Sequence, residues 1–290
     1  MLARAKVNVA LAVKGLRPDG YHEVETVLQS ITLHDEVLVE RSRRPGSIIE
    51  WAPGLTGALP GRPDIVETTL ALARELVPEL PTAEVRVIKR IPPGAGLGGG
   101  SADAAAALLG AVALHGRSLP EPVVEEIARK AGVDVPFCLR GGTALGTGLG
   151  DEIRALPCAR TLWWVIGIPG TPLSTPAVYG RYDRLPAPAR GEIEEVVDGL
   201  VTGSLGQVAG GMFNHLEPAA FDLLPELAGM KEAMLGAGAI GSVMTGSGSA
   251  IIGLCRDSSH ARSVAAEARK IFPRVEVSAS ARAGNEMLSR

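Results

Sequence analysis

Aromatic residues and cysteines are scarce in this sequence. Phe, Trp and Tyr together make up 3% of the 290 residues, so each tyrosine in a loop stands out. The three cysteines, Cys138, Cys158 and Cys255, lie far apart, and no CxxC pair or Cys/His cluster occurs. The sequence therefore contains neither a zinc motif nor a disulfide framework, which is typical of a protein kept in a reducing compartment.

A strong net charge is also missing. The 29 basic residues (Lys and Arg) and 32 acidic residues give a formal charge of -3. A protein that wraps nucleic acid is usually strongly basic. We therefore expect no nucleic-acid partner, and we interpret the short basic run at 41–44 as a solvated turn.

Long hydrophobic runs are absent as well. The longest, Ala104 to Leu114, includes a glycine and is far shorter than the roughly 20 residues of a membrane-spanning helix. The first 15 residues include Arg4 and Lys14 and contain no apolar run suited to a signal peptide. We therefore expect a cytoplasmic protein without membrane contact.

The spacing of apolar residues predicts an α+β fold in the first half of the chain. Alternation of apolar and polar residues predicts strands at 6–15, 23–33, 35–41 and 83–91. Apolar residues three and four positions apart predict helices at 64–77, 102–115 and 120–132. Asp64 and Ser101 are the predicted N-caps of the first two helices. Residues 141–153 are predicted to form a hairpin with a glycine-rich bend.

The second half repeats this mixture after a change of composition near residue 156. Strands are predicted at 161–170 and 274–280, and two more around a Gly-Ser-Gly turn within 239–255. Helices are predicted at 191–200, 221–235 and 258–272. We therefore predict two domains, residues 1–155 and 156–290.

The glycine-rich stretch IPPGAGLGGGSADAAAALLG, residues 91–110, is the most unusual segment. It matches GxGxxG, but the Pro92-Pro93 pair and the antiparallel strands before it do not fit a dinucleotide-binding fold. No Lys-Ser or Lys-Thr follows the glycines, which excludes a P-loop. A glycine loop that opens a helix offers free N–H groups and roughly half a positive charge. We interpret it as a polyphosphate site, with a tight packing turn as the alternative.

Lys6, Asn8 and Asp134 are polar residues in apolar surroundings. Lys6 and Asn8 share one side of a predicted strand with Ala10 and Ala12, which suggests a covered face, although a solvent-exposed face is the alternative. A covered lysine needs a partner. Asp134, in AGVDVPFCL, is a candidate partner; otherwise it caps a helix or forms a turn.

Tyr21 and His22 follow a predicted turn and are candidates for binding a flat ring. Tyrosine offers a stacking face, and histidine can hydrogen-bond to the edge of a base. Tyr179 could supply the opposing ring. The alternative is an exposed hairpin tip. The TGSGSA segment, residues 245–250, is predicted to be a hairpin turn, which could also approach the phosphate site of the glycine loop.

Five of these segments together resemble the GHMP kinase superfamily. The resemblance covers nearly the whole chain, in the expected order, through the segments AKVNVALAV, RPDGYHEVETV, PPGAGLGGGSADAA, GVDVPF and TGSGSA. The DGYH element and the GLGGGS loop resemble the members whose alcohol substrate is linked to cytidine diphosphate, rather than homoserine or mevalonate kinases.

The resemblance implies a fold and an activity. The fold would be the two-domain GHMP kinase fold with a ferredoxin-like C-terminal half. The N-terminal domain would bind ATP and carry catalysis. The reaction would transfer the γ-phosphate of ATP, with Mg²⁺, to the 2-hydroxyl of a cytidine-linked methylerythritol in non-mevalonate isoprenoid biosynthesis. The alternatives are another small-molecule kinase of the homoserine or mevalonate type and a nucleotide-binding module without enzyme activity, against which the presence of both Lys6 and Asp134 speaks.

The resemblance also assigns roles by position. Lys6 and Asp134 match the catalytic pair, and no residue is assigned as a metal ligand. The residues matched to substrate binding are Asn8, Tyr21, His22, Thr175 and Tyr179. The residues matched to the ATP-phosphate loop are Pro92, Pro93, Gly94, Ala95, Gly96, Leu97, Gly98, Gly99, Gly100, Ser101 and Ala102.

Three positions depart from the pattern of the superfamily. Ala102 replaces a second serine, so a hydroxyl contact with phosphate or metal depends on Ser101 alone. Asp64 stands where many relatives have Asn beside the adenine pocket. His215 stands where an acidic residue is frequent, and we assign it no role.

Overall fold

The larger of two β-sheets contains strands from both halves of the chain. The computed structural model describes residues 1–53, 55, 64–186, 188 and 191–287. Strands β12, β1, β2, β4 and β3 lie in that order, while β5 pairs with β2 and β6, and β8 pairs with β1. The bounds are β1 (Leu2–Leu16), β2 (His22–Arg41), β3 (Gly46–Trp51), β4 (Ala83–Lys89), β5 (Thr143–Thr147), β6 (Glu152–Ala155), β8 (Phe213–Asn214) and β12 (Asn285–Glu286).

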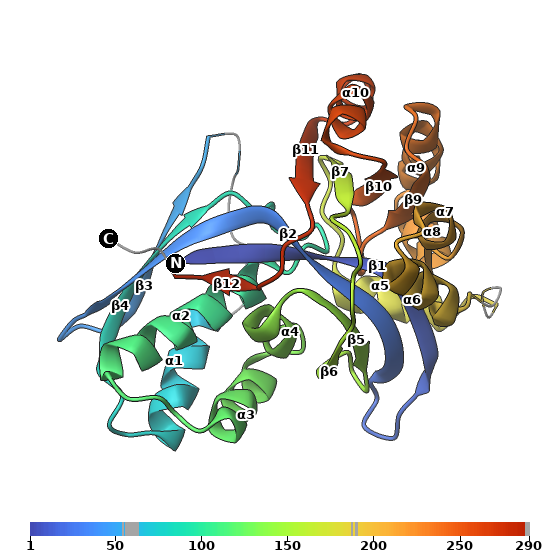
Figure 1. Ribbon diagram of the computed structural model, residues 1–290. Helices are drawn as coiled ribbons and strands as arrows, with labels where there is room; N and C mark the ends of the chain where they lie inside the picture. The colour runs from blue at the N-terminus through green and yellow to red at the C-terminus, as the bar shows by residue number, and fades with distance from the viewer. Residues whose placement is uncertain (54, 56–63, 187, 189–190, 288–290) are drawn as a thin grey trace.

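The two longest strands, β1 and β2, run antiparallel across the molecule (Figure 1). The sequence predicts separate strands at 23–33 and 35–41. The predicted break between them is wrong, because both ranges belong to the continuous strand β2. Register shifts interrupt the pairing of β1 with β2 on both sides of the segment that holds Lys6 and Asn8. The extra residues lie on β2 at the shift between Arg4 and Lys6, and on β1 at the shift between Asn8 and Ala10. The covered face predicted for these residues is confirmed, since both side chains are buried.

Four helices cover one side of this sheet (Figure 1). They are α1 (Ile65–Leu76), α2 (Gly99–His115), α3 (Glu121–Ala131) and α4 (Val135–Arg140). The alanines at 104–107 of α2 are fully buried beside Val85 and Val87 of β4. Small side chains allow this close approach, and at Gly110 an added Cβ would lie 2.5 Å from Val39. The alanine run therefore seats α2 directly against the sheet.

The predicted N-cap of α1 is confirmed, whereas the predicted N-cap of α2 is wrong. Asp64 caps α1 as predicted, accepting a hydrogen bond from the N–H of Val66 at 2.8 Å. The predicted cap at Ser101 is wrong, because α2 begins at Gly99 after a left-handed Gly98. Three consecutive glycines allow the helix to start earlier than the side-chain pattern indicates. Ser101 therefore lies in the first turn of α2.

The second half forms a four-stranded antiparallel sheet with the order β11-β7-β10-β9. Helices separate β7 from β9 and β10 from β11, which is the ferredoxin-like arrangement expected. Its strands are β7 (Trp163–Ile168), β9 (Gly241–Met244), β10 (Ile251–Cys255) and β11 (Arg274–Ala279). Its helices are α5 (Thr175–Tyr182), α6 (Ile193–Thr202), α7 (Leu205–Gly210), α8 (Glu217–Leu223), α9 (Glu226–Gly236) and α10 (Ser258–Ala268).

The single helix predicted at 221–235 is divided in the structure. Helix α8 ends at Leu223 and α9 begins at Glu226, with Pro225 between them. Proline lacks an N–H and restricts the residue before it, so a helix usually ends there. The rest of the predicted order of strands and helices is confirmed.

The chain passes from the larger sheet to the smaller one after β6 ends at Ala155. We propose this point as the boundary between the domains 1–155 and 156–290, with β8 and β12 returning to pair with β1. Cys138, Cys158 and Cys255 are free thiols. None of the helices in the described ranges combines the length and apolar character that a membrane span requires.

A buried ion cluster lies beneath the start of α2. The Lys89 ammonium on β4 contacts the carboxylates of Asp35 on β2 and Asp103 on α2, the latter at 2.5 Å. All three side chains are almost completely buried. Burial alone would lower the pKa of the Lys89 ammonium, but the two carboxylates raise it above its usual value. The cluster was not identified from the sequence, and it joins three elements under the glycine loop.

Replacing Lys89 tests this cluster. We expect Lys89→Met to lower the free energy of unfolding by about 3–5 kcal/mol, because it leaves two buried carboxylates without their cation. Urea denaturation measures this change. Arg86→Met on the same strand is the control, since Arg86 is 50% exposed in its pair with Glu50, and should cost no more than about 1 kcal/mol. Equal losses in both variants would contradict this account of the cluster.

Candidate active site

The glycine loop, residues 92–100, alternates left-handed glycines with buried side chains. Gly94, Gly96 and Gly98 have φ values of 66°, 75° and 68°, a region that favours glycine because it has no Cβ. The intervening Ala95 and Leu97 are buried in the hydrophobic core. Every second residue therefore anchors the loop, while the glycines turn the backbone toward the start of α2.

Two of these glycines lie where no side chain fits. A Cβ on Gly96 would lie 2.1 Å from the carbonyl oxygen of Thr245, and a Cβ on Gly98 would lie 2.8 Å from Cγ of Lys6. The N–H of Lys6 also donates to the carbonyl of Leu97 at 3.0 Å. Strand β1 and loop 245–250 therefore pack directly on the glycine loop, which brings together three segments that are distant in sequence.

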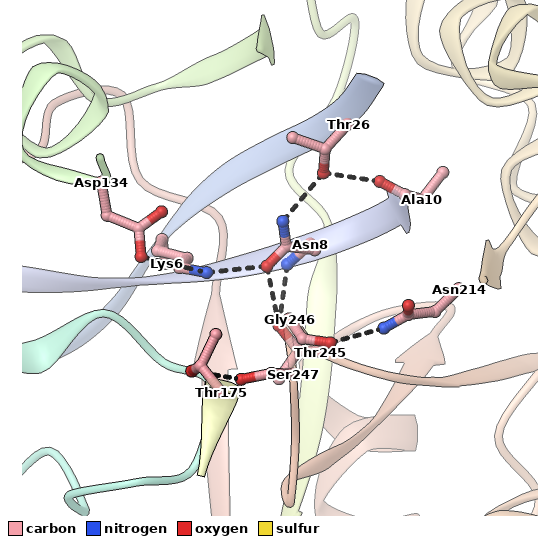
Figure 2. Close-up of polar contacts among 10 residues, drawn as sticks. All are labelled: Lys6, Asn8, Ala10, Thr26, Asp134, Thr175, Asn214, Thr245, Gly246 and Ser247. Carbon is pink, nitrogen blue, oxygen red and sulfur yellow. Dashed lines mark hydrogen bonds and ion pairs between the residues drawn. The ribbon is translucent and has the colours of Figure 1, made fainter. Parts of the chain in front are cut away.

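Lys6 and Asp134 face each other beside this loop (Figure 2). The Lys6 ammonium lies 3.5 Å from the Asp134 carboxylate and 2.8 Å from Oδ1 of Asn8. The Lys6 side chain is 6% exposed, whereas that of Asp134 is 35% exposed. Asp134 stands at the start of α4 but makes no side-chain capping bond. The pairing expected from the sequence is present, and the carboxylate remains accessible.

Asn8 links Lys6 to both β2 and loop 245–250. Its Nδ2 donates to Oγ1 of Thr26 at 2.8 Å, and its backbone N–H donates to Oγ1 of Thr245 at 2.8 Å. The Thr26 hydroxyl in turn donates to the carbonyl of Ala10 at 2.7 Å. These bonds fix the amide of Asn8 so that its oxygen points at the Lys6 ammonium (Figure 2).

Asn214 holds loop 245–250 in place. Its Nδ2 donates to the carbonyls of Met244 and Gly246, both at 2.7 Å, and its Oδ1 accepts from the N–H of Leu216. The loop in turn donates the N–H of Ala250 to the carbonyl of Ala95. The predicted approach of TGSGSA to the glycine loop is confirmed. Asn214 itself was missed, because a two-residue strand carries no periodicity.

The proposed ring-binding residues are brought together only in part. The rings of His22 and Tyr179 stack, with centroids 5.0 Å apart, and His22 Nε2 lies 2.7 Å from the Asp183 carboxylate. Tyr21 is 64% exposed and has no ring contact within the described residues. Burial raises the pKa of the Tyr179 phenol to about 12, and the Asp134 carboxylate adds to that rise. His22 and Tyr179 therefore come together, whereas Tyr21 stands apart from them.

Thr175, at the start of α5, joins this helix to loop 245–250. Its hydroxyl hydrogen-bonds to that of Ser247 at 2.8 Å (Figure 2). Because Tyr179 lies one turn further along α5, the same helix carries both residues to the site.

The three departures from the superfamily have local explanations. Ala102 is fully buried in the alanine face of α2, so its side chain does not reach the loop surface. Asp64 is engaged by the N–H of Val66 and by the Ser47 hydroxyl. His215 accepts a hydrogen bond from the N–H of Val13 through Nδ1, and burial lowers its pKa.

The fold and the paired side chains at a glycine loop define a class of small-molecule kinases. The family model for the GHMP kinases N terminal domain matches residues 64–142, and the model for the GHMP kinases C terminal domain matches residues 196–274. The chain belongs to the GHMP kinase family.

Within this family, the chain is similar to kinases of one kind. It is 40% identical to a 4-diphosphocytidyl-2-C-methyl-D-erythritol kinase of Pelotomaculum thermopropionicum over 93% of each chain. It is 38% identical to the kinase of that name from Streptomyces avermitilis, over 90% of this chain and 89% of the relative. A crystal structure of 4-(cytidine 5'-diphospho)-2C-methyl-D-erythritol kinase superposes with a TM-score of 0.78 and 32% identity, covering 97% of this chain and 98% of the other.

The close contact at Gly98 leads to a direct test of the loop. We expect Gly98→Ala to lower kcat/KM for ATP at least about tenfold, because its Cβ would meet the Lys6 side chain and the left-handed conformation costs roughly 1–2 kcal/mol for other residues. Steady-state kinetics with varied ATP measures this. In Gly206→Ala, a helix position with open space around it, the value should stay unchanged. Normal ATP kinetics in Gly98→Ala would exclude a tightly constrained loop.

Proposed function

We propose that this chain transfers the γ-phosphate of ATP to the 2-hydroxyl of 4-diphosphocytidyl-2-C-methyl-D-erythritol, a step toward isoprenoid precursors. The observation that carries the proposal is the Lys6–Asp134 pair, at 3.5 Å, next to the glycine loop. Relatives with 37–40% identity over most of the chain have this kinase name. The three free thiols and the lack of a membrane-spanning helix in the described ranges are compatible with a cytoplasmic enzyme.

The glycine loop and the start of α2 would bind the phosphates of ATP. The first N–H groups of a helix have no acceptor within it, and the helix dipole favours an anion at this end. The loop has no lysine of its own, so Lys6 supplies the positive charge from β1. We propose residues 92–102 as the phosphate-binding segment, with the amides of its glycines as the donors.

We propose that Mg²⁺ enters with ATP. Among the described residues, no group of three or more His, Cys, Asp or Glu side chains could hold a metal ion. Mg²⁺ usually keeps several waters and is bound by substrate phosphates with one or two protein oxygens. The Ser101 hydroxyl in the first turn of α2 fits this limited role. The ion would neutralise phosphate charge.

Asp134 is proposed as the group that accepts the proton of the attacking hydroxyl. The substrate oxygen forms a bond to the γ-phosphorus while the bond between that phosphorus and the β–γ bridging oxygen breaks, releasing ADP. The proton of the hydroxyl passes to the Asp134 carboxylate. Lys6 stabilises charge on the transferred group, and Asn8 holds the ammonium in position through its Oδ1.

The cytosine of the substrate would bind at the rings next to this pair. We propose that Tyr21 and Tyr179 stack on the base, that His22 contacts its edge, and that Thr175 lies near the substrate. Tyr21 has 64% of its surface exposed, so its ring is available for stacking. The attached alcohol, which follows the ribose and the diphosphate, would then reach Asp134.

A homoserine or mevalonate kinase activity is the alternative within the family. A homoserine kinase from Cytophaga hutchinsonii superposes with a TM-score of 0.73 but 24% identity, and an L. major mevalonate kinase with 0.71 and 16%. These likenesses establish the fold alone. Homoserine and mevalonate have no base to stack on Tyr21 and Tyr179.

Measuring ATP consumption with each alcohol separates these functions. We expect ADP release to depend on 4-diphosphocytidyl-2-C-methyl-D-erythritol and to remain at background with homoserine or mevalonate. Phosphorus NMR of the product should show one new phosphomonoester. Turnover of homoserine or mevalonate in preference to the cytidine substrate would refute the proposed function.

The role of Asp134 leads to a separate prediction. Asp134→Asn should lower kcat at least about a hundredfold with a small change in KM, because a positioned general base contributes roughly 10²–10⁴ in rate. The same ADP-release assay measures this loss. Asp198→Asn, an exposed aspartate of α6, is the matched control and should keep normal kinetics. Near-normal turnover in Asp134→Asn would remove Asp134 from this role.

A further inference from the structure

Two side chains of helix α5 and its C-cap residue, Asp183, hold the His22 imidazole. Tyr179 stacks on the ring with an interplanar angle of 30°, Tyr182 meets it edge-on at 89°, and the Asp183 carboxylate lies 2.7 Å from Nε2. Positions 179, 182 and 183 share one face of a helix. The His22 side chain is consequently only 9% exposed, although Asp183 is 48% exposed. Both the plane and the rotation of the ring are fixed.

The contact with Asp183 also determines which nitrogen of His22 carries hydrogen. An ionised carboxylate only accepts hydrogen bonds, so Nε2 must be the donor. In the neutral imidazole, Nδ1 is then an acceptor with a free lone pair. None of the hydrogen bonds found among the described residues involves Nδ1 of His22. This nitrogen is therefore available to a ligand.

We propose that Asp183 is a positioning residue for base selection: it fixes the tautomer of His22 so that Nδ1 accepts a hydrogen bond from the exocyclic amino group of cytosine. The inference rests on the proposed function, because it assumes that a cytidine nucleotide binds with its edge toward His22. Asp183 itself acts through His22 and makes no contact with the reacting atoms.

The chemistry of cytosine and uracil makes a hydrogen bond to Nδ1 of His22 selective for cytosine. On the pairing edge of cytosine, N3 and O2 are acceptors, so the amino group is the one donor that an acceptor nitrogen can use. Uracil has a carbonyl oxygen in place of that amino group. In the same pose, two lone pairs would then face each other, and a site built around a hydrogen bond rejects a ligand that cannot form it. Asp183 therefore confers a preference for cytidine over uridine.

The preference can be measured with the two nucleotide forms of the substrate. In the wild type, we expect kcat/KM for the cytidine form to exceed that for the uridine form by at least about tenfold, as for one good base contact. Asp183→Asn should reduce this ratio about tenfold, because an amide can pair with either tautomer of His22 and the Nδ1–H form can donate to uracil. KM for ATP should stay unchanged.

Asp222→Asn is the matched control. Asp222 also pairs with a side chain of α5, Arg181 at 2.6 Å, and is 48% exposed like Asp183. Its replacement should leave the ratio between cytidine and uridine substrates at the wild-type value. An equal loss in both variants would show a general effect of loosening α5 and overturn the proposal.

Nitrogen NMR tests the tautomer without any substrate. The chain has five histidines, and the ring signals that disappear in His22→Gln identify those of His22. We expect the wild-type ring to show hydrogen on Nε2 and a free Nδ1, and Asp183→Asn to show a mixture. A ring with hydrogen on Nδ1 in the wild type would overturn the inference. Failure of the proposed function would appear separately, as no turnover of the cytidine substrate by the wild type.

Discussion

The contact between the Lys6 side chain and Gly98 governs the architecture of the site. It places the buried ammonium of Lys6 against the turn that opens α2, where an added Cβ would come within 2.8 Å of the lysine stem. The cation is held there by Asn8 and Asp134 rather than by solvent. The glycine loop therefore gains a positive charge that its own sequence lacks, and the remaining segments are arranged around this contact.

The second half of the chain completes the site through loop 245–250. Asn214 fixes the carbonyls on both sides of Thr245, Thr245 accepts the N–H of Asn8, and its carbonyl lies against Gly96. Thr175 attaches α5 to the same loop through Ser247. A single short loop thus connects the phosphate-binding segment, the catalytic strand and the helix that carries Tyr179. Such connections tie substrate binding to the geometry of the Lys6–Asp134 pair.

Local patterns predicted most elements but failed where local and tertiary preferences differ. The alternation of apolar and polar residues in 6–15 was sufficient to predict β1. The apolar residues three and four positions apart in 64–77 were sufficient to predict α1. The start of α2 was misplaced at Ser101, because glycines 98–100 carry no side-chain pattern and the turn is set by Lys6 and Thr245 packing on it. The ion cluster of Lys89, Asp35 and Asp103 could not be found from the sequence, since its members are separated by long stretches and pair only across three elements.

The sequence by itself determined the kinds of group in the site: a glycine loop without a lysine, a lysine on a strand of small apolar residues, an aspartate among apolar neighbours and tyrosines in an aromatic-poor chain. Only the tertiary structure decided how they meet. Lys6 reaches the loop because β1 packs directly on Gly98, which has no Cβ, and His22 presents Nδ1 because Asp183, at the end of α5, binds its other nitrogen. Residue type follows from local chemistry, whereas distance and hydrogen-bond direction depend on packing between segments that no local pattern connects.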